Sequence, residues 1–132
     1  MIDPSLLPHS GVSREELHER AARLAAFLKR EEIPLAIVGY NPDLFYFTGS
    51  IQSGYALVTQ EGEIVYLVKK DPERARLESP LERIVPYRRF REIGDSVKTL
   101  LGKMPRRVML PLDVVPTDLF LRFKDLLDRA HI

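Results

Sequence analysis

Residues 33–49 read IPLAIVGYNPDLFYFTG, and this stretch decides the fold class. Leu35–Val38 is a short unbroken apolar run, which is typical of a strand covered on both faces. Asn41-Pro42-Asp43 has the composition of a turn, and proline is favoured in the first turn of a helix. We therefore expect a short helix over Leu44–Thr48 that ends at Gly49, with the glycine in a left-handed conformation.

Two β-rich runs follow this stretch, Tyr55–Thr59 and Ile64–Val68. The residues between them, Gln60-Glu61-Gly62-Glu63, contain a glycine at a position where a tight turn needs positive φ. This pattern predicts an antiparallel hairpin with Gly62 in its turn.

Helices are expected on both sides of this central part. Ser13 can cap the first, with Glu16 at the capping-box spacing, and Pro34 requires the helix to end near Glu31–Ile33. Asp71 and Pro72 have the order of an N-cap and a first helical residue. The other expected elements are the rest of that helix to about Leu77, a strand at Arg83–Val85 closed by Pro86, a helix with apolar positions from Phe90 to Met104, a strand at Val108–Leu110, and a final helix capped by Thr117 with apolar positions from Leu119 to Ala130.

These elements predict a single α/β domain. Their order is helix, strand, helix, strand, strand, helix, strand, helix, strand, helix, so strands alternate with helices except at the hairpin. Such an order predicts a three-layer α/β/α architecture around a mixed sheet that contains one antiparallel hairpin. A chain of 132 residues has the length of one domain. We expect a lead-in segment at residues 1–12 and the domain itself at residues 13–132.

The composition excludes several classes of function. Lys plus Arg is 20 and Asp plus Glu is 19, so the net charge is +1 and nothing drives the whole chain toward nucleic acid or an anionic membrane. The absence of cysteine excludes disulfides, thiolate catalysis and cysteine-based metal sites. No apolar run approaches the ~20 residues of a membrane helix, and the first residues lack the pattern of a signal peptide. We expect a cytoplasmic protein that is not bound to a membrane.

Motifs for catalysis, cofactors and metals are missing. The seven glycines form neither a P-loop nor a dinucleotide fingerprint, and there is no GxSxG elbow. The three histidines are far apart, and His18 is interpreted as a solvated surface residue. Four aspartates gather near the end of the chain, where helix capping and solvation are favoured over metal ligation; they are Asp113, Asp118, Asp125 and Asp128. The sequence therefore predicts no catalytic residue and no metal site in this chain.

One basic cluster, Tyr87-Arg88-Arg89-Phe90-Arg91, interleaves aromatic and cationic residues. Such a cluster can hold phosphates and stack bases. The alternative is a loop into the next helix, with Phe90 buried and the arginines solvated or paired with Glu92 and Asp95. The small net charge favours the loop, and nucleic-acid binding stays a minor hypothesis.

The segment from Ala21 to Lys70 resembles a known family. The resemblance rests on Asn41-Pro42-Asp43, on the tetrad Tyr46-Phe47-Thr48-Gly49 and on the hairpin that follows. Together they are similar to the N-terminal domain of the creatinase/prolidase family, which includes Xaa-Pro dipeptidases and aminopeptidase P. The tetrad resembles that domain's Tyr-(Leu/Tyr/Phe)-Thr-Gly signature, and the whole chain fits the domain's length and order of elements.

This resemblance implies a ribonuclease-H-like fold and an accessory role. In the family, two divalent metal ions sit in a separate C-terminal domain that supplies two aspartates, a histidine and two glutamates, and nothing in this chain corresponds to that domain. The N-terminal domain contributes to dimer contacts and narrows the entrance for Xaa-Pro peptides. The chain alone is then not an enzyme, while a parent protein would be a metal-dependent Xaa-Pro dipeptidase that forms a homodimer.

The predicted site residues are Tyr46, Thr48 and Gly49, at the carboxyl end of a strand, where open α/β sheets usually present ligand sites. Tyr46 can equally be a packed aromatic residue of the core. The alternative function is a free-standing peptide- or protein-binding module with the same fold. The reading frame after Ile132 discriminates the two functions, because a peptidase requires the metal ligands to follow.

Overall fold

The protein is described from a computed structural model, and the structure describes residues 12–39, 41–110 and 117–127. The order of helices and strands expected from the sequence is confirmed. The elements are α1 (Arg14–Arg30), β1 (Leu35–Val38), α2 (Asn41–Thr48), β2 (Gly54–Thr59), β3 (Ile64–Val68), α3 (Pro72–Glu78), β4 (Ile84–Pro86), α4 (Arg91–Leu101), β5 (Val108–Met109) and α5 (Thr117–Leu126).

The five strands form one mixed sheet in the order β4-β3-β2-β1-β5. β2 and β3 make the expected antiparallel hairpin, and β1 runs antiparallel to β2. The two outer pairs, β3 with β4 and β1 with β5, are parallel. β1 thus lies inside the sheet, and all four of its residues are buried.

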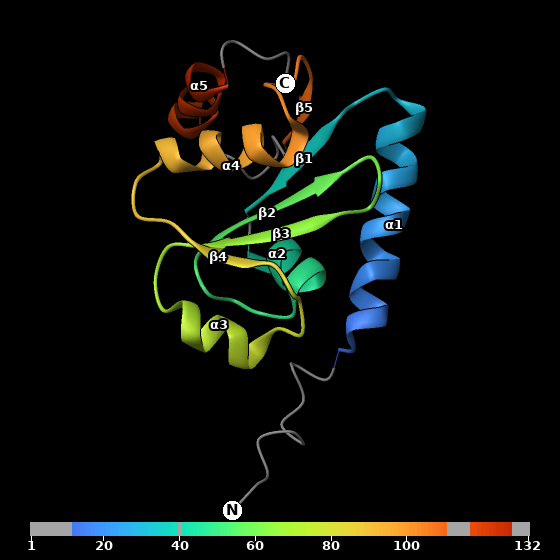
Figure 1. Ribbon diagram of the computed structural model, residues 1–132, viewed down its shortest axis with the longest axis vertical. Helices are drawn as coiled ribbons and strands as arrows, with labels where there is room; N and C mark the ends of the chain where they lie inside the picture. Colours follow the sequence, from blue (N-terminus) through green and yellow to red (C-terminus); the bar gives the residue numbers. More distant parts are fainter. Residues whose placement is uncertain (1–11, 40, 111–116, 128–132) are drawn as a thin grey trace, which may run out of the picture.

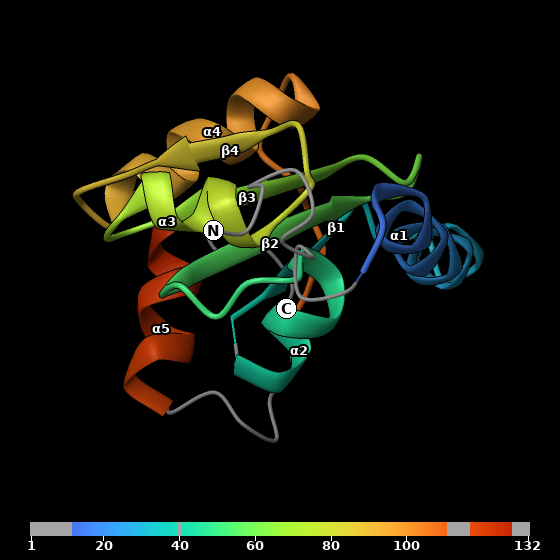
Figure 2. The same ribbon diagram turned by 90° about the horizontal axis from the view of Figure 1, so that it is seen from below.

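Helices cover both faces of the sheet, which confirms the three-layer architecture (Figures 1 and 2). We call the side covered by α1, α2 and α3 the first face, and the side covered by α4 and α5 the second face. Buried residues of the first face include Leu17, Ala21, Leu28, Leu44, Ala75, Ala36, Val38, Ala56, Val58, Tyr66 and Val68. Buried residues of the second face include Leu35, Ile37, Leu57, Val65, Leu67, Tyr87, Ile93, Val97, Phe123 and Leu127.

The sequence of β1 shows why both faces are closed. Successive side chains of a strand point to opposite faces. Ala36 and Val38 accordingly lie in the core of the first face, while Leu35 and Ile37 lie in the core of the second. A strand that is apolar at every position must be covered twice, which is what the unbroken run predicts.

The expected helix and turn signals act as predicted at several ends. The Ser13 hydroxyl accepts a hydrogen bond from the Glu16 N–H at 3.1 Å, and the Asp71 carboxylate accepts one from the Arg74 N–H at 3.0 Å. Pro72 is the first residue of α3, and Gly62 has φ +84° in the hairpin turn. Each end is therefore set by a local side-chain bond or by a residue that permits the conformation.

The end of α4 differs from the expectation. The apolar positions predict a helix as far as Met104, but α4 ends at Leu101 and Gly102 adopts φ +80° as its C-cap. A glycine in the left-handed region ends a helix at little steric cost, and here it overrides the periodicity. Met104 still packs against the second face, from the segment beyond the helix.

The outer edge of β4 is largely closed to further pairing. The Tyr66 N–H donates to the Arg83 carbonyl and the Tyr87 N–H donates to the Val68 carbonyl, so alternate groups of β4 face β3. The backbone N–H and C=O groups of Ile84, and the backbone C=O group of Pro86, consequently point away from the sheet. Arg76 donates to the Ile84 carbonyl at 3.4 Å, and Pro86 has no N–H to offer.

Some expectations concern residues that the structure leaves undescribed. The lead-in segment lies outside the described residues apart from Val12, and so do Asp113, Ala130 and the side chain of Thr117. Phe123 of α5 and Leu127, the residue after the helix, are buried, as predicted. Within the described ranges, no helix has the length and apolar character required to cross a membrane.

Candidate functional site

The predicted site residues lie where α2 ends, and Tyr46 is on its surface. The Tyr46 side chain is 42% exposed. The Arg20 guanidinium stands over its ring, 4.4 Å from the centroid, and donates to the Tyr46 carbonyl at 2.8 Å. Arg23 Nη2 lies 3.4 Å from the Tyr46 hydroxyl oxygen, and this contact raises the pKa of the Arg23 guanidinium. The ring thus stands against α1 and remains open to solvent on its other side.

Thr48, in contrast to Tyr46, points into the protein interior. Its side chain is fully buried, and its hydroxyl donates to the Leu44 carbonyl at 2.7 Å. The same oxygen accepts a hydrogen bond from the Ser50 N–H at 3.1 Å. Gly49 follows with φ +77°, which confirms the expected left-handed conformation. The structure therefore separates the predicted residues: Tyr46 is on the surface, whereas Thr48 and Gly49 shape the chain between α2 and β2.

We call residues 49–53 the α2–β2 turn. Its backbone is held by side chains as well as by other backbone groups. The Gln52 N–H donates to Ser50 Oγ at 3.1 Å, and the Tyr66 hydroxyl donates to the Gln52 carbonyl at 2.6 Å. The Lys69 N–H donates to the Ser53 carbonyl at 2.9 Å. Buried backbone groups outside helices and strands need such partners, so these bonds define the path of the turn.

Glu78, the last residue of α3, contacts the α2–β2 turn from the neighbouring helix. Its Oε1 accepts a hydrogen bond from Ser50 Oγ at 2.8 Å. Gln52 Nε2 lies 3.2 Å from each of its oxygens, and Arg74 Nε donates to Oε2 at 3.2 Å. Burial by itself would raise the pKa of Glu78, but the hydrogen bonds from Ser50, Gln52 and Arg74 outweigh it and hold the pKa below its ordinary value.

Tyr66 connects the turn to the sheet. It is a fully buried residue of β3, and burial raises the pKa of its hydroxyl. Its hydroxyl lies 3.0 Å from Ser50 Oγ as well as close to the Gln52 carbonyl. The phenol is therefore neutral near pH 7, and it can donate its proton to the Gln52 carbonyl of the turn.

Ile51 lies between Ser50 and Gln52, which are both held by hydrogen bonds, and its own side chain is exposed. Its side chain has 60% of its surface open to solvent, while Ser50 is almost fully buried. Figure 1 shows the segment between α2 and β2 passing close to α3. The arrangement presents one exposed apolar side chain on a backbone that is held by hydrogen bonds.

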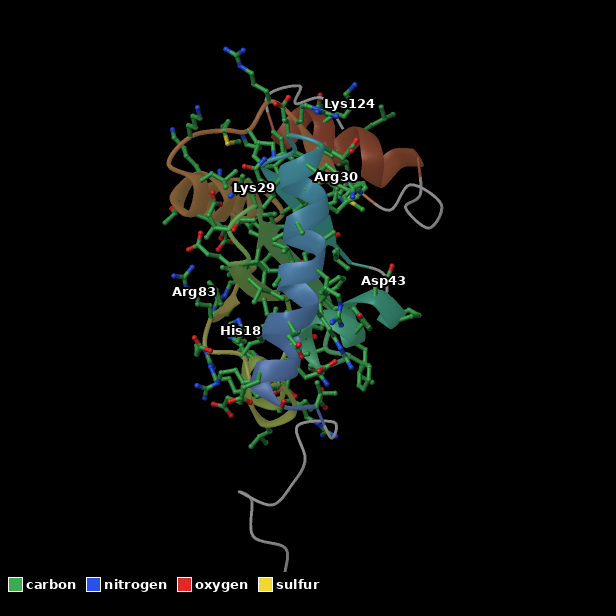
Figure 3. The ribbon with its side chains drawn as sticks, turned by 90° about the vertical axis from the view of Figure 1, so that its right-hand side faces the viewer. His18, Lys29, Arg30, Asp43, Arg83 and Lys124 are labelled. Carbon is green, nitrogen blue, oxygen red and sulfur yellow. The ribbon has the colours of Figure 1, made fainter. Side chains whose placement is uncertain are left out.

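A metal centre has no basis in the described residues, because nowhere in those ranges do three His, Asp or Glu side chains gather. His18 is half-exposed on α1 (Figure 3), and its Nε2 lies 3.1 Å from Glu82 Oε1. Arg14 also pairs with Glu82, at 3.4 Å. The expectation of a solvated His18 is thus incomplete, because the ring joins α1 to the segment before β4.

The basic cluster of residues 87–91 has the geometry of a loop leading into α4. Tyr87 is buried, and the Arg88 and Arg89 side chains are exposed. The Glu92 carboxylate accepts the backbone N–H groups of Arg88 at 3.1 Å and Arg89 at 2.6 Å, and these bonds lower its pKa. The expected pairing with Glu92 is therefore made by backbone N–H groups, while the Arg88 and Arg89 guanidinium groups act on it through their charge. Phe90 is partly buried and lies under the Arg122 guanidinium, 4.3 Å from its ring centroid.

Sequence reasoning missed the network residues. Ser50 follows the predicted tetrad directly, but Glu78 is 28 positions further on and sits on a helix whose other charges are exposed. Tyr66 reads as one apolar position in a strand. Only the sequence position of Ser50, next to a left-handed glycine, carried a signal that could have drawn attention to the turn.

Comparison with known proteins identifies the family. The model of the creatinase/prolidase N-terminal domain matches residues 20–132. The chain belongs to the creatinase/prolidase N-terminal domain family. The resemblance noted from Asn41-Pro42-Asp43 and the tetrad 46–49 is thereby confirmed.

Relatives of this creatinase/prolidase N-terminal domain include an Xaa-Pro dipeptidase from Pyrococcus horikoshii. It is 25% identical over 88 residues, which cover 65% of this chain and 24% of that protein. The chain thus spans about a quarter of the length of this curated relative.

Solved structures share the fold. The prolidase from P. horikoshii has a TM-score of 0.75 and 17% identity, with 86% of this chain and 31% of that chain covered. The N-terminal domain of an X-Pro dipeptidase from Streptococcus pyogenes has a TM-score of 0.70 and 14% identity, with 87% and 92% covered. The N-terminal domain of the cytoplasmic peptidase PepQ from Mycobacterium tuberculosis has a TM-score of 0.71 and 17% identity, with 83% and 85% covered. At these identities the likeness establishes the fold.

Proposed function

We propose that this domain is the accessory N-terminal part of a metal-dependent Xaa-Pro dipeptidase. In that role it narrows the substrate entrance and supports association of two subunits, and it performs no chemistry of its own. The metal ions and the hydrolytic step belong to a C-terminal domain of the full-length protein, which we expect to act in the cytoplasm.

The observation that carries the proposal is the α2–β2 turn in a chain of this family. Family membership extends over residues 20–132, and the curated relative it matches is an Xaa-Pro dipeptidase. Within the domain, Tyr46 and Ile51 are apolar or aromatic side chains held at the surface by a hydrogen-bonded backbone. Rigid, exposed side chains of this kind suit the wall of an entrance, because they lose little conformational freedom on contact.

The chemistry of the donor set agrees with this division of labour. A catalytic dimetal site needs carboxylates and histidines that converge on one point. In residues 12–39, 41–110 and 117–127 no such group of three is present, so the described residues do not fit a metal centre. We derive no step of hydrolysis through a metal in this domain.

A second candidate function is a peptide- or protein-binding module. It is favoured by the large apolar side chains that α2 and the turn leave exposed, namely Phe45, Tyr46 and Ile51. Such side chains commonly mark contact sites when they share one surface. The module would use the same surface residues without any peptidase partner.

The test uses the full-length protein encoded by the gene, assayed on an Xaa-Pro dipeptide with added divalent metal. We expect hydrolysis that a chelator abolishes. Tyr46→Ala and Ile51→Ser should then lower kcat/KM while the metal content stays unchanged. Leu121→Ser is the matched control, because Leu121 is a comparably exposed apolar residue on α5, which covers the opposite face of the sheet.

The outcomes separate the two candidates. Chelator-sensitive turnover with a selective loss in Tyr46→Ala or Ile51→Ser supports the accessory role. A full-length protein without turnover on Xaa-Pro dipeptides contradicts the peptidase and favours the binding module. Turnover that neither substitution changes removes Tyr46 and Ile51 from the entrance.

A further inference from the structure

The α2–β2 turn is unusual in what holds it. It lies outside helices and strands, yet Ser50 N–H, Gln52 N–H and the Gln52 carbonyl all have side-chain partners. Two of those partners are residues of the turn or of α2, and the third is Tyr66 of the sheet. Such a turn is stable only while the side chains that complete it keep their orientation.

Glu78 orients one of those side chains, that of Ser50, and it also holds the side chain of Gln52. Its carboxylate lies 2.8 Å from Ser50 Oγ and 3.2 Å from Gln52 Nε2. The Ser50 hydroxyl has a single proton, which it donates to Glu78 in a hydrogen bond. The lone pairs of its oxygen are then free to accept a hydrogen bond from the Gln52 N–H. A charged acceptor is a stronger partner for a hydroxyl than a neutral one, so the negative charge of Glu78 fixes this orientation.

The attachment of α3 to the domain does not depend on Glu78. Ala75 is fully buried on the first face, and the Arg76 guanidinium reaches the Ile84 carbonyl at 3.4 Å. Asp71 caps the other end of the helix. Glu78 can therefore be neutralised while α3 keeps its packing, which makes its role separable from general stability.

We propose that Glu78 is a positioning residue: its carboxylate fixes the α2–β2 turn and thereby sets where the Ile51 side chain stands at the surface. The link to substrate rests on the proposed function, in which Ile51 borders the entrance. The link to the turn itself does not, because it follows from the contacts of Glu78 with Ser50 and Gln52.

Hydrogen–deuterium exchange on the 132-residue chain tests the link to the turn. Glu78→Gln keeps the size of the side chain and removes its charge. We expect exchange in the peptide covering residues 49–53 to become at least about tenfold faster, while β1 keeps its protection. Glu73→Gln is the matched control, because Glu73 is exposed on the same helix, and it should leave the turn protected.

Two results would overturn the proposal. One is a Glu78→Gln turn as protected as in the unchanged chain. The other is an equal loss of protection in the turn and in β1, which would make Glu78 a general stability residue. Should Glu78→Gln fail to fold, Glu78→Asp keeps the charge and withdraws the carboxylate from Ser50 Oγ and Gln52 Nε2. It must then loosen the turn selectively, or the proposal is wrong.

Kinetics of the full-length protein test the link to substrate. Glu78→Gln should raise KM for an Xaa-Pro dipeptide several-fold with kcat nearly unchanged, because Glu78 touches no reacting atom. Glu73→Gln should leave both constants as they are. An unchanged KM in Glu78→Gln contradicts a role at the entrance. Absence of turnover in the unchanged protein refutes the proposed function instead, and the exchange result on the turn stands independently of it.

Discussion

The two faces of the sheet are held in different ways, and two buried tyrosines show the difference. Tyr66 lies on the first face, and its hydroxyl is within hydrogen-bond distance of the Gln52 carbonyl and Ser50 Oγ. Tyr87 lies on the second face, where burial, and then the nearby Tyr55, raises the pKa of its hydroxyl to about 12. Among the described residues, the Tyr87 hydroxyl has no hydrogen-bond partner, and its ring contacts Tyr55 instead.

The second face accordingly depends on burial and on ring contacts. Tyr55 and Phe90 pack around Phe123, with centroid separations of 5.2 Å and 4.8 Å. Burial is favourable but non-directional, so it stabilises the fold without prescribing one loop conformation. The first face adds directional hydrogen bonds beside its apolar core, and those bonds specify the α2–β2 turn. The comparison indicates that burial stabilises both faces, whereas residues of the first face also specify the geometry of the turn.

The largest expected effect comes from emptying the core of the second face at β1. Ile37→Ala should lower the free energy of unfolding by about 2–5 kcal/mol, because Ile37 is almost fully buried in an internal strand. Urea denaturation measures the change. Val85→Ala on the edge strand β4 is the control and should cost under about 1 kcal/mol. A change in Ile37→Ala below about 0.5 kcal/mol would contradict the buried position of β1.

The next effect concerns the backbone of the first face at Gly49. Gly49→Val should destabilise the chain by about 1–3 kcal/mol, because a β-branched residue is strained at φ +77°. The same denaturation experiment measures it. Val at this position should also increase exchange in residues 49–53. A variant as stable as the original chain would show that the turn can adopt another conformation at no cost.

The comparison is sharpest for the two tyrosines. Tyr66→Phe removes the donor to the Gln52 carbonyl and should lower the free energy of unfolding by about 1–3 kcal/mol. Tyr87→Phe keeps the buried ring and removes a hydroxyl that has no partner in the described structure, so it should change stability by less than about 0.5 kcal/mol. Equal effects of the two substitutions, measured by thermal or urea denaturation, would remove the distinction between the faces.

A smaller effect is expected from pH. The pKa of Glu78 is held below its ordinary value, so its hydrogen bonds stabilise the fold above about pH 4.3 and are lost as pH falls through the folded-state pKa. The pKa values of Glu82, which accepts a hydrogen bond from His18, and of Glu92 are lowered as well. Protonation of these two carboxylates at low pH therefore also destabilises the fold. The fall in Tm between about pH 6 and pH 3 should therefore be smaller in Glu78→Gln than in the unchanged chain. An identical fall in the two proteins would exclude Glu78 as a contributor.

The smallest effect is expected at the exposed end of α2. Tyr46→Phe should change stability by less than about 0.5 kcal/mol, because the Arg23 contact at 3.4 Å is on the surface. The ring remains under Arg20, and Tyr46→Leu, which removes it, should cost about 0.5–1 kcal/mol. Denaturation of the three proteins checks the order. A loss above about 1 kcal/mol in Tyr46→Phe would place the hydroxyl in a buried structural bond.

Much of the fold was predictable because its signals are local. The unbroken apolar run at 35–38 indicated a strand with both faces covered, and Asp71-Pro72 indicated the start of a helix. Gly49 and Gly62 indicated left-handed backbone conformations. The pairing of β5 with β1 could not be predicted from local signals, because it depends on contacts between residues more than 70 positions apart. Periodicity also failed at the end of α4, where Gly102 ends the helix before the further apolar position at Met104.

The substrate-entrance role of Tyr46, Thr48 and Gly49 stays a prediction. The structure shows only that their environments differ, because the Thr48 side chain is buried while Tyr46 lies at the surface. The partners that fix the turn come from β3 and α3 and have ordinary roles in their own elements. Glu78 looks like any other helix carboxylate until the fold places it 2.8 Å from Ser50 Oγ.

The outer edge of β4 has a consequence for solubility and assembly. With Pro86 facing outward and the Ile84 carbonyl already engaged by Arg76, that border of the sheet is a poor template for an additional strand from another chain. Growth of the sheet into fibrillar or domain-swapped species is disfavoured there during synthesis and at high concentration. Two copies of the domain that met at this border would therefore contact each other through side chains, and surface chemistry would select that contact instead of backbone pairing.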